Sequence, residues 1–108
     1  MKKPVERLFN SITKDNLWIY ILKILSKEEL HPYRIREEIK KRFGFKPGNV
    51  TTYIVLKKLE AQGFVKKKRE KSTLGPERNC YKITAKGRKE IKKGVMLLKR
   101  LTKTIEKC

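Results

Sequence analysis

The sequence is poor in the residue types that build metal centres and disulfide frameworks. Only two cysteines, Cys80 and Cys108, and one histidine, His31, occur among its 108 residues. Zinc sites are built from clusters of such ligands, so no zinc site can be written for this chain. We favour reduced thiols in a cytoplasmic protein, and a disulfide bond between the two cysteines is the alternative.

Long apolar runs and catalytic motifs are missing as well. The longest apolar run, from Leu17 to Leu22, falls far short of the roughly 18 residues that a membrane span requires, and the N-terminus lacks the apolar region of a signal peptide. The sequence contains no phosphate-binding glycine loop, carboxylate pair or catalytic triad. The lone His31 has no second ligand or nucleophile to act with. These absences argue against a membrane protein, a bound cofactor and an enzyme.

Acidic residues are scarce relative to basic ones. Asp and Glu number 11 against 30 Lys and Arg, which gives a net charge of +19 at pH 7. A field of this sign attracts polyanions, and nucleic acid is the usual partner of so basic a domain. A lysine bias from genome composition or growth at high temperature is the alternative. The helix pattern described next favours nucleic acid.

Apolar residues recur at helical spacing in three segments of the first half. Residues 1–13 predict a short amphipathic helix, and residues 16–26 predict a buried helix with Asp15 as its N-cap. A third helix begins at Pro32, a residue suited to the first helical position, and stops before Gly44, a residue suited to the position after a helix end.

The next segments predict a helix-turn-helix unit with a wing. The breaker segment 45–48 separates the third helix from a fourth, which starts near Asn49 as its cap and ends near Gln62. After Gly63, two short strands flank a flexible tip at residues 72–76. These strands form a β-hairpin, which is the wing.

The last segment predicts a long helix from residue 85 to about residue 107, with Thr84 as its N-cap. At 1.5 Å per residue this helix is about 33 Å long. One small domain cannot cover that length, so the near-heptad apolar seam indicates a partner helix. Hydrophobic residues make up only 38% of the chain, and a homodimer would add buried area. The predicted dimer-interface residues are Ile91, Val95, Leu98, Leu101 and Ile105.

Together these segments predict a mainly α fold, namely a winged helix-turn-helix with a small β-hairpin wing and a long C-terminal dimerisation helix. We expect residues 1–84 to form the winged-helix DNA-binding domain, including the short N-terminal helix. Residues 85–108 are expected to form the dimerisation helix of the same compact unit.

The fourth helix is the candidate for insertion into the major groove of DNA. Winding it at 100° per residue separates an apolar inner face from an outer face of hydrogen-bonding, apolar and cationic side chains. Asparagine can pair with adenine, small apolar groups can touch a thymine methyl, and lysines near the far end can meet phosphates. The alternative is that Val50 and Ile54 cover another helix. The predicted recognition-helix contacts are Asn49, Val50, Thr51, Tyr53, Ile54, Lys57 and Lys58.

The wing is the second candidate for DNA contact, through the backbone or the minor groove. Lysines also discourage edge-to-edge pairing of strands, so a charge-protected strand edge is an alternative that is compatible with DNA contact. The predicted wing contacts are Lys66, Lys67, Lys68, Arg69, Lys71 and Arg78.

Three segments resemble the PadR family of winged-helix regulators. Residues 30–35 (Leu-His-Pro-Tyr-Arg-Ile) are similar to the family's Leu-His-Gly-Tyr-x-Ile, with a proline in place of the glycine. Residues 51–60, followed by Gly-Phe-Val at 63–65, are similar to its recognition helix and wing entry. Residues 81–87 resemble its Tyr-Arg-Leu-Thr-x-x-Gly junction. Thr52 departs from the pattern, because the family usually has leucine there.

The resemblance implies a homodimer held by the C-terminal helix, with help from the N-terminal helix, that binds a palindromic operator in double-stranded DNA, commonly as a repressor. It does not identify a small-molecule effector. Trp18 would suit an effector platform, but a core or dimer-interface role is the better interpretation in so apolar a helix. Two alternatives stay open: a ribosome-associated or structured-RNA-binding winged-helix protein, and an architectural DNA-binding protein of low specificity.

Overall fold

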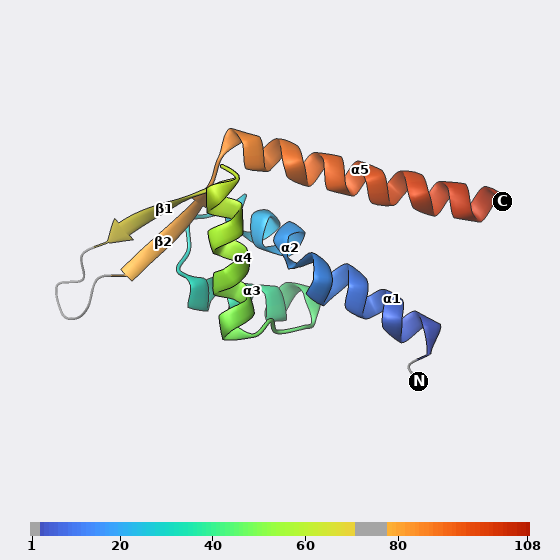
Figure 1. Cartoon of the computed structure of the whole chain (residues 1–108), viewed down its shortest axis with the longest axis horizontal. Helices are drawn as coiled ribbons and strands as arrows, with labels where there is room; N and C mark the ends of the chain where they lie inside the picture. Colours follow the sequence, from blue (N-terminus) through green and yellow to red (C-terminus); the bar gives the residue numbers. More distant parts are fainter. Residues whose placement is uncertain (1–2, 71–77) are drawn as a thin grey trace.

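A computed structural model of the chain describes residues 3–70 and 78–108, apart from the side chains of residues 70 and 78. The fold is mainly helical with one antiparallel hairpin, as predicted. In chain order the elements are α1 (Pro4–Thr13), the 3₁₀ turn η1 (Lys14–Asn16), α2 (Leu17–Leu25), α3 (Pro32–Phe43), α4 (Asn49–Ala61), β1 (Val65–Glu70), β2 (Arg78–Ile83) and α5 (Ala85–Lys107) (Figure 1).

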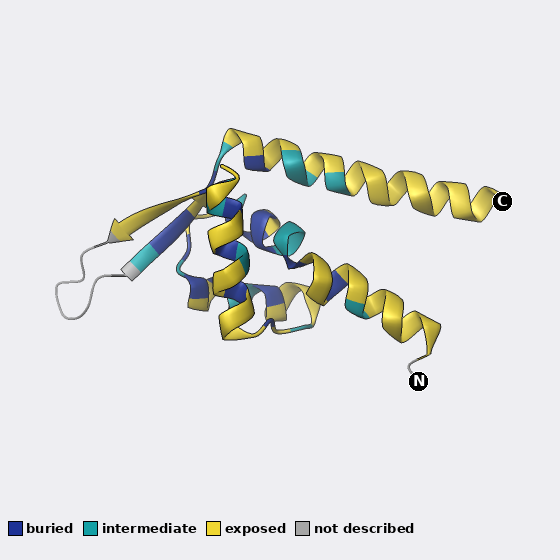
Figure 2. Cartoon of the chain, viewed as in Figure 1, coloured by how far each residue is buried: buried dark blue, intermediate teal, exposed yellow. Residues whose placement is uncertain are grey.

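Helix α2 lies at the centre of the core. It packs against α3, α4, α5 and β2, and the dark-blue buried segments of Figure 2 surround it. The predicted apolar stripe is confirmed, because five of its nine residues are buried. These buried residues are Leu17, Ile21, Leu22, Ile24 and Leu25.

The junction between α1 and α2 differs from the prediction. Asp15 is not the N-cap of α2: residues 14–16 form a 3₁₀ turn, and Asn16 occupies the cap position without capping through its side chain. Instead, Asn16 Nδ2 donates to the Ser11 carbonyl at 2.7 Å, and its Oδ1 accepts from Trp18 Nε1 at 3.2 Å. The amide is therefore used to hold α1 against the start of α2.

Helix α3 has the predicted boundaries. Pro32 is its first residue, and Gly44 ends it in the left-handed region at φ 79°, where its N–H donates to the Lys40 carbonyl. A left-handed residue at this position satisfies a carbonyl that the helix itself leaves unpaired. Ile35 and Ile39 are fully buried.

Helix α4 begins one residue earlier than predicted. Gly48 is its N-cap and Asn49 is its first helical residue, so Asn49 does not cap the helix. The buried Thr52 hydroxyl donates to the Gly48 carbonyl at 2.7 Å. This bond satisfies a polar group that would otherwise be buried without a partner, and it explains how a threonine is accommodated in an apolar position.

The hairpin is anchored at its base. Strands β1 and β2 pair antiparallel with Val65 opposite Ile83, and Leu30 adds two backbone hydrogen bonds to Tyr81 at the start of α3. Val65, Tyr81 and Ile83 are buried, so this end of the hairpin belongs to the core. The predicted tip, residues 72–76, lies outside the described residues.

Helix α5 begins with the predicted cap. Thr84 Oγ1 accepts from the Gly87 N–H at 3.1 Å and donates to the Gly63 carbonyl at 2.7 Å. The first half of the helix packs on α2. From Val95 to the C-terminus every residue is exposed, so the second half is uncovered in a single chain (Figure 2).

Within the described residues, no helix is both long and apolar enough to cross a membrane.

Candidate nucleic-acid interface

The outer face of α4 is exposed to solvent in a single chain. The structure separates the two faces as the periodicity predicts: Thr52, Leu56 and Leu59 are buried, and Val55 is half-buried. All seven residues of the predicted recognition set are exposed, namely Asn49, Val50, Thr51, Tyr53, Ile54, Lys57 and Lys58.

Two of these exposed residues are apolar, which is unusual for a solvated face. Val50 is 70% exposed and Ile54 is 49% exposed. Neither side chain is therefore buried against another helix of this chain. Exposed apolar groups beside an asparagine and lysines are suited to a groove that offers both thymine methyls and hydrogen-bonding base edges.

The turn before α4 holds this face in a fixed orientation. Arg36 Nε of α3 donates to the carbonyl of the buried Pro47 at 3.0 Å. Phe45 packs edge-on against Tyr20 of α2, with ring centroids 5.0 Å apart. The turn is thus tied to both preceding helices, and α4 leaves it at a defined angle.

A tyrosine under α4 connects it to the hairpin. Tyr81 of β2 is buried, and burial raises the pKa of its hydroxyl; the charges of Glu60 and Tyr53 raise that pKa further. Since the ordinary tyrosine pKa is near 10, Tyr81 stays neutral at neutral pH. The Tyr81 side chain therefore adds no charge beside the helix.

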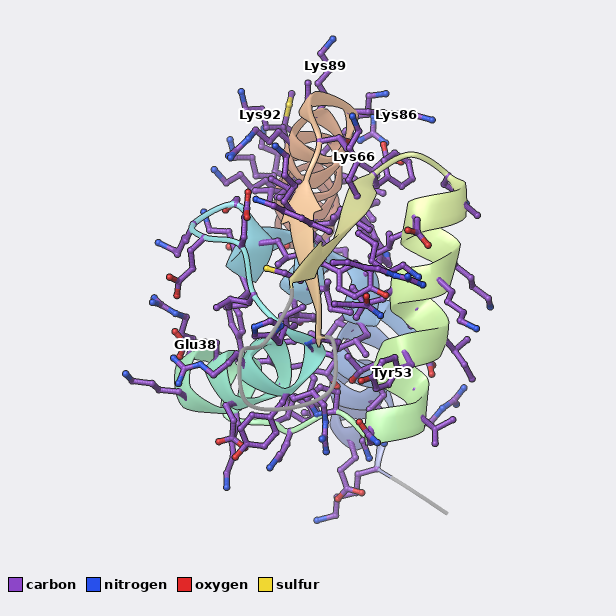
Figure 3. All side chains as sticks on the ribbon, turned by 90° about the vertical axis from the view of Figure 1, so that its left-hand side faces the viewer. Glu38, Tyr53, Lys66, Lys86, Lys89 and Lys92 are labelled. Carbon is purple, nitrogen blue, oxygen red and sulfur yellow. The ribbon has the colours of Figure 1, made fainter. Side chains whose placement is uncertain are left out.

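The described wing lysines are exposed. Lys66, Lys67 and Lys68 are exposed on β1, as is Arg69. Lys66, the second residue of β1, lies at the end where α5 starts, whereas Tyr53 lies toward the other end of α4 (Figure 3). Of the remaining predicted wing contacts, Lys71 and the side chain of Arg78 lie outside the described residues.

Opposite charges do not neutralise this surface. Among the described residues, ion pairs form on α3 and its following turn, between Arg42 and Glu38 at 3.8 Å and between Lys46 and Glu37 at 2.7 Å. Lys57 and Lys58 of α4 have no such partner within the part of the chain that the structure describes. Their charge is available to phosphates, which supply the sequence-independent part of DNA affinity.

His31 has a structural place. Its Nδ1 lies 3.1 Å from the Asn79 carbonyl oxygen, which links the start of α3 to β2. The described residues hold no group of three or more His, Cys, Asp or Glu side chains placed to bind a metal ion.

Trp18 of α2 is half-buried against α5, and it also lines a cavity. A Cβ added at Gly94 would lie 2.9 Å from Trp18 Cη2, so the Trp18 ring and α5 are in close contact. The cavity, about 360 Å³ in volume, includes Val55 and Leu59 of α4 in its lining. Trp18 therefore combines core packing with exposure to a recess beside the fourth helix.

The comparisons with known proteins agree on one family. The family described as "Transcriptional regulator PadR-like family" matches residues 21–93. No functionally curated protein is similar enough in sequence to count as a match.

Solved structures share the fold over most of the chain. A transcriptional regulator from Clostridium thermocellum is 23% identical, with a TM-score of 0.80 over 90% of this chain and 93% of its own. A PadR-like transcriptional regulator from Bacillus cereus is 26% identical, with a TM-score of 0.72 over 89% and 93%. Bacillus subtilis PadR, solved in complex with operator DNA, is 28% identical, with a TM-score of 0.68 over 73% of this chain and 46% of its own.

Proposed function

The chain belongs to the PadR-like family of transcriptional regulators, and from this premise we propose that it is a sequence-specific DNA-binding repressor that recognises a palindromic operator as a homodimer. The observation that carries the proposal is the exposed outer face of α4, where asparagine, apolar and lysine side chains share one surface. No enzymatic role is proposed, because the family is one of regulators.

Direct reading of the operator is assigned to the first turns of α4. Asn49 is placed to bond with an adenine edge, and Val50 and Ile54 are placed to touch thymine methyls. Thr51 and Tyr53 complete the polar part of this surface. The Bacillus subtilis relative, which was solved in complex with operator DNA and matches 73% of this chain, supports DNA as the ligand.

Phosphate contacts are assigned to the far end of α4 and to the wing. Lys57 and Lys58 lie in the second half of the helix and have no acidic partner among the described residues. Contacts of this kind fix the register of a protein on the duplex but carry no sequence information. The wing contacts proposed are Lys66, Lys67, Lys68, Arg69, Lys71 and Arg78.

Homodimerisation is supported by two uncovered apolar faces. On α5, Leu98 is 49% exposed and Ile105 is 73% exposed, with Leu101 between them. On α1, Leu8 and Phe9 are equally uncovered. Contiguous exposed apolar surface of this kind marks protein–protein contact. We assign Ile91, Val95, Leu98, Leu101 and Ile105 to the interface, with Ile91 at its edge because it is half-buried against the core of its own chain.

A two-fold dimer presents the same reading surface twice, so its operator should be an inverted repeat. In this arrangement residues 1–84 supply the DNA-binding part and residues 85–108 the dimerisation helix of one unit.

Selection of duplexes from a random pool by the purified full-length chain, followed by footprinting, tests the proposal. Enrichment of an inverted repeat, protected on both half-sites, is the expected result, and a reporter under that site should be repressed. Co-sedimentation with ribosomal subunits without enrichment of any duplex sequence would overturn it and favour structured RNA.

A further inference from the structure

Helix α5 carries a basic surface, interrupted by the exposed Met96, that operator binding by α4 does not use. Seven exposed cations lie on one side of the helix, within an arc of about 120° when wound at 100° per residue. From the first to the last they extend about 27 Å along the axis. This basic stripe consists of Lys89, Lys92, Lys93, Lys99, Arg100, Lys103 and Lys107.

The stripe contains no acidic residue. Both glutamates of the helix, Glu90 and Glu106, fall outside its arc. None of the seven cations forms an ion pair within the part of the chain that the structure describes. Like charges spaced three or four residues apart destabilise a helix by a few tenths of a kcal/mol each. An external polyanion would relieve this repulsion.

The stripe faces away from the body of the protein. Gly94 lies on the opposite side of α5, where an added Cβ would meet Trp18 and Ile19 of α2 at 2.9 and 3.0 Å. The exposed apolar residues of the proposed dimer seam lie on that same side. Pairing with a second copy through the seam therefore leaves the stripe uncovered.

The stripe also lies far from the reading surface of α4. In Figure 3, Lys89 and Lys92 occupy one end of the molecule and Tyr53 lies toward the other. A duplex held by the first turns of α4 approaches from the Tyr53 end. The stripe is thus directed at a different ligand.

The hairpin base is also positive at the same end, although Lys66 is one of the wing contacts proposed for the operator and is not part of the stripe. Lys66 of β1 is paired directly with Lys82 of β2, and both side chains are exposed. Like charges directly opposite each other destabilise a strand pair. Lys66 lies at the end where Lys86 and Lys89 begin α5 (Figure 3).

We propose that the basic stripe is a second, sequence-independent binding surface for the phosphate backbone of double-stranded DNA, through which one dimer bridges two duplexes. A 27 Å length of duplex carries roughly 16 phosphates, enough to contact all seven cations. A membrane surface is a poorer fit, because the apolar side of α5 packs on α2 and forms the proposed dimer seam. The bridging role rests on the proposed operator binding by α4, whereas the stripe's own affinity for DNA does not.

The first experiment tests the stripe independently of the operator. The full-length chain carrying Lys57→Ala and Lys58→Ala serves as background, and its binding to a duplex of arbitrary sequence is measured against salt concentration. The stripe variant adds Lys92→Gln, Lys99→Gln and Lys103→Gln. The matched control instead adds Lys23→Gln, Lys40→Gln and Lys41→Gln, which are exposed on α2 and α3.

Removal of three phosphate contacts should lower the salt slope by about 2.7, since each contributes about 0.9. The matched control should leave the slope close to that of the background. Circular dichroism and light scattering verify that each variant keeps its helix content and its assembly state. An unchanged slope in the stripe variant overturns the proposal.

The second experiment tests bridging. An immobilised duplex bearing the selected operator is loaded with the otherwise wild-type chain, and retention of a labelled duplex without that site is measured. A chain that carries only Lys92→Gln, Lys99→Gln and Lys103→Gln, with Lys57 and Lys58 intact, should lose about tenfold in retention of the labelled duplex while still binding the immobilised one. Equal retention by wild type and variant, or preferential capture of labelled double-stranded RNA, overturns the proposal. Failure to select any operator would instead count against the proposed function of α4.

Discussion

Lys86 Nζ donates a hydrogen bond to the carbonyl oxygen of Gln62 at 2.7 Å, which ties the first turn of α5 to the end of α4. The same ammonium lies 4.9 Å from the centroid of the Phe64 ring. A cation at the C-terminal end of a helix interacts favourably with its dipole. The contact fixes the terminal helix to the helix that we propose to read DNA.

Replacing Lys86 by methionine should therefore weaken this attachment. The methylene stem is retained, but the hydrogen bond and the charge at the end of α4 are lost. We expect a loss of about 0.5 to 1 kcal/mol in the free energy of unfolding, measured by urea denaturation. Lys89→Met, which removes a lysine that has no such bond, is the control. Equal stability of the two variants would show that the bond contributes nothing.

Gly94 should not tolerate a large side chain. Gly94→Leu would force apart α5 and α2, because the new Cβ meets the rigid ring of Trp18, and overpacking of this kind costs about 1 to 3 kcal/mol. Trp18 is the only tryptophan in the chain, so its fluorescence should shift to the red as the ring gains exposure. Met96→Leu, at an exposed position of the same helix, should change neither signal. A Gly94→Leu protein with native stability and native Trp18 emission would contradict close packing of α5 against Trp18.

The two parts of the α4 surface should respond differently to mutation. Lys57→Ala with Lys58→Ala should weaken binding to all duplexes and lower the salt slope by about 1.8. Asn49→Ala or Ile54→Ala should instead erode discrimination between operator and mutated sites by about 1 to 3 kcal/mol. Competition gel shifts at several salt concentrations separate the two effects. Unchanged discrimination in both single variants would argue against insertion of α4 into the groove.

Leu98→Asp should abolish the homodimer. The side chain is half-exposed in one chain, so a charge there is tolerated by the monomer but is costly when desolvated between two helices. Light scattering should report the mass of a single chain. Lys103→Asp, on the basic side of α5, is the control and should remain dimeric. If Leu98→Asp stays dimeric, the α5 seam is not the interface.

Tyr20 should make stability depend on alkaline pH. Its hydroxyl donates to the Ile12 carbonyl at 2.6 Å, and burial raises its pKa above the ordinary value. A group whose pKa is raised by folding contributes stability below its unfolded pKa, near 10, and loses it as pH rises through the folded value. Denaturation midpoints should thus fall more steeply above about pH 10 in the wild type than in Tyr20→Phe. Parallel curves for the two proteins would exclude this contribution.

The boundaries of most elements could be predicted because local residue chemistry determines them. Pro32, Gly44 and Thr84 each act at a helix end through their own backbone or side chain, and all three lie where the sequence indicates. The inner face of α4 follows from periodicity alone. These features depend on residues close in the chain.

The errors at helix starts occurred where neighbouring residues are all suited to be the cap. Asp15 and Asn16 are both capping residues, and only the contacts of Asn16 with Ser11 and Trp18 show that a 3₁₀ turn intervenes. At the start of α4, Gly48 and not Asn49 is the cap, and the Thr52 hydroxyl bonds to the Gly48 carbonyl. The direction of the basic stripe could not be predicted either, since it depends on which side of α5 meets Trp18.

The hydroxyl of Thr84 links the turn between α4 and β1 to the first turn of α5, since it donates to the Gly63 carbonyl and accepts from the Gly87 N–H. This one oxygen therefore restrains the junction at which α4, the hairpin and α5 meet. In the proposed homodimer, a change in the position of α5 would therefore move the hairpin and α4 with it. The crossing of the terminal helices would then set the distance between the two half-sites on DNA.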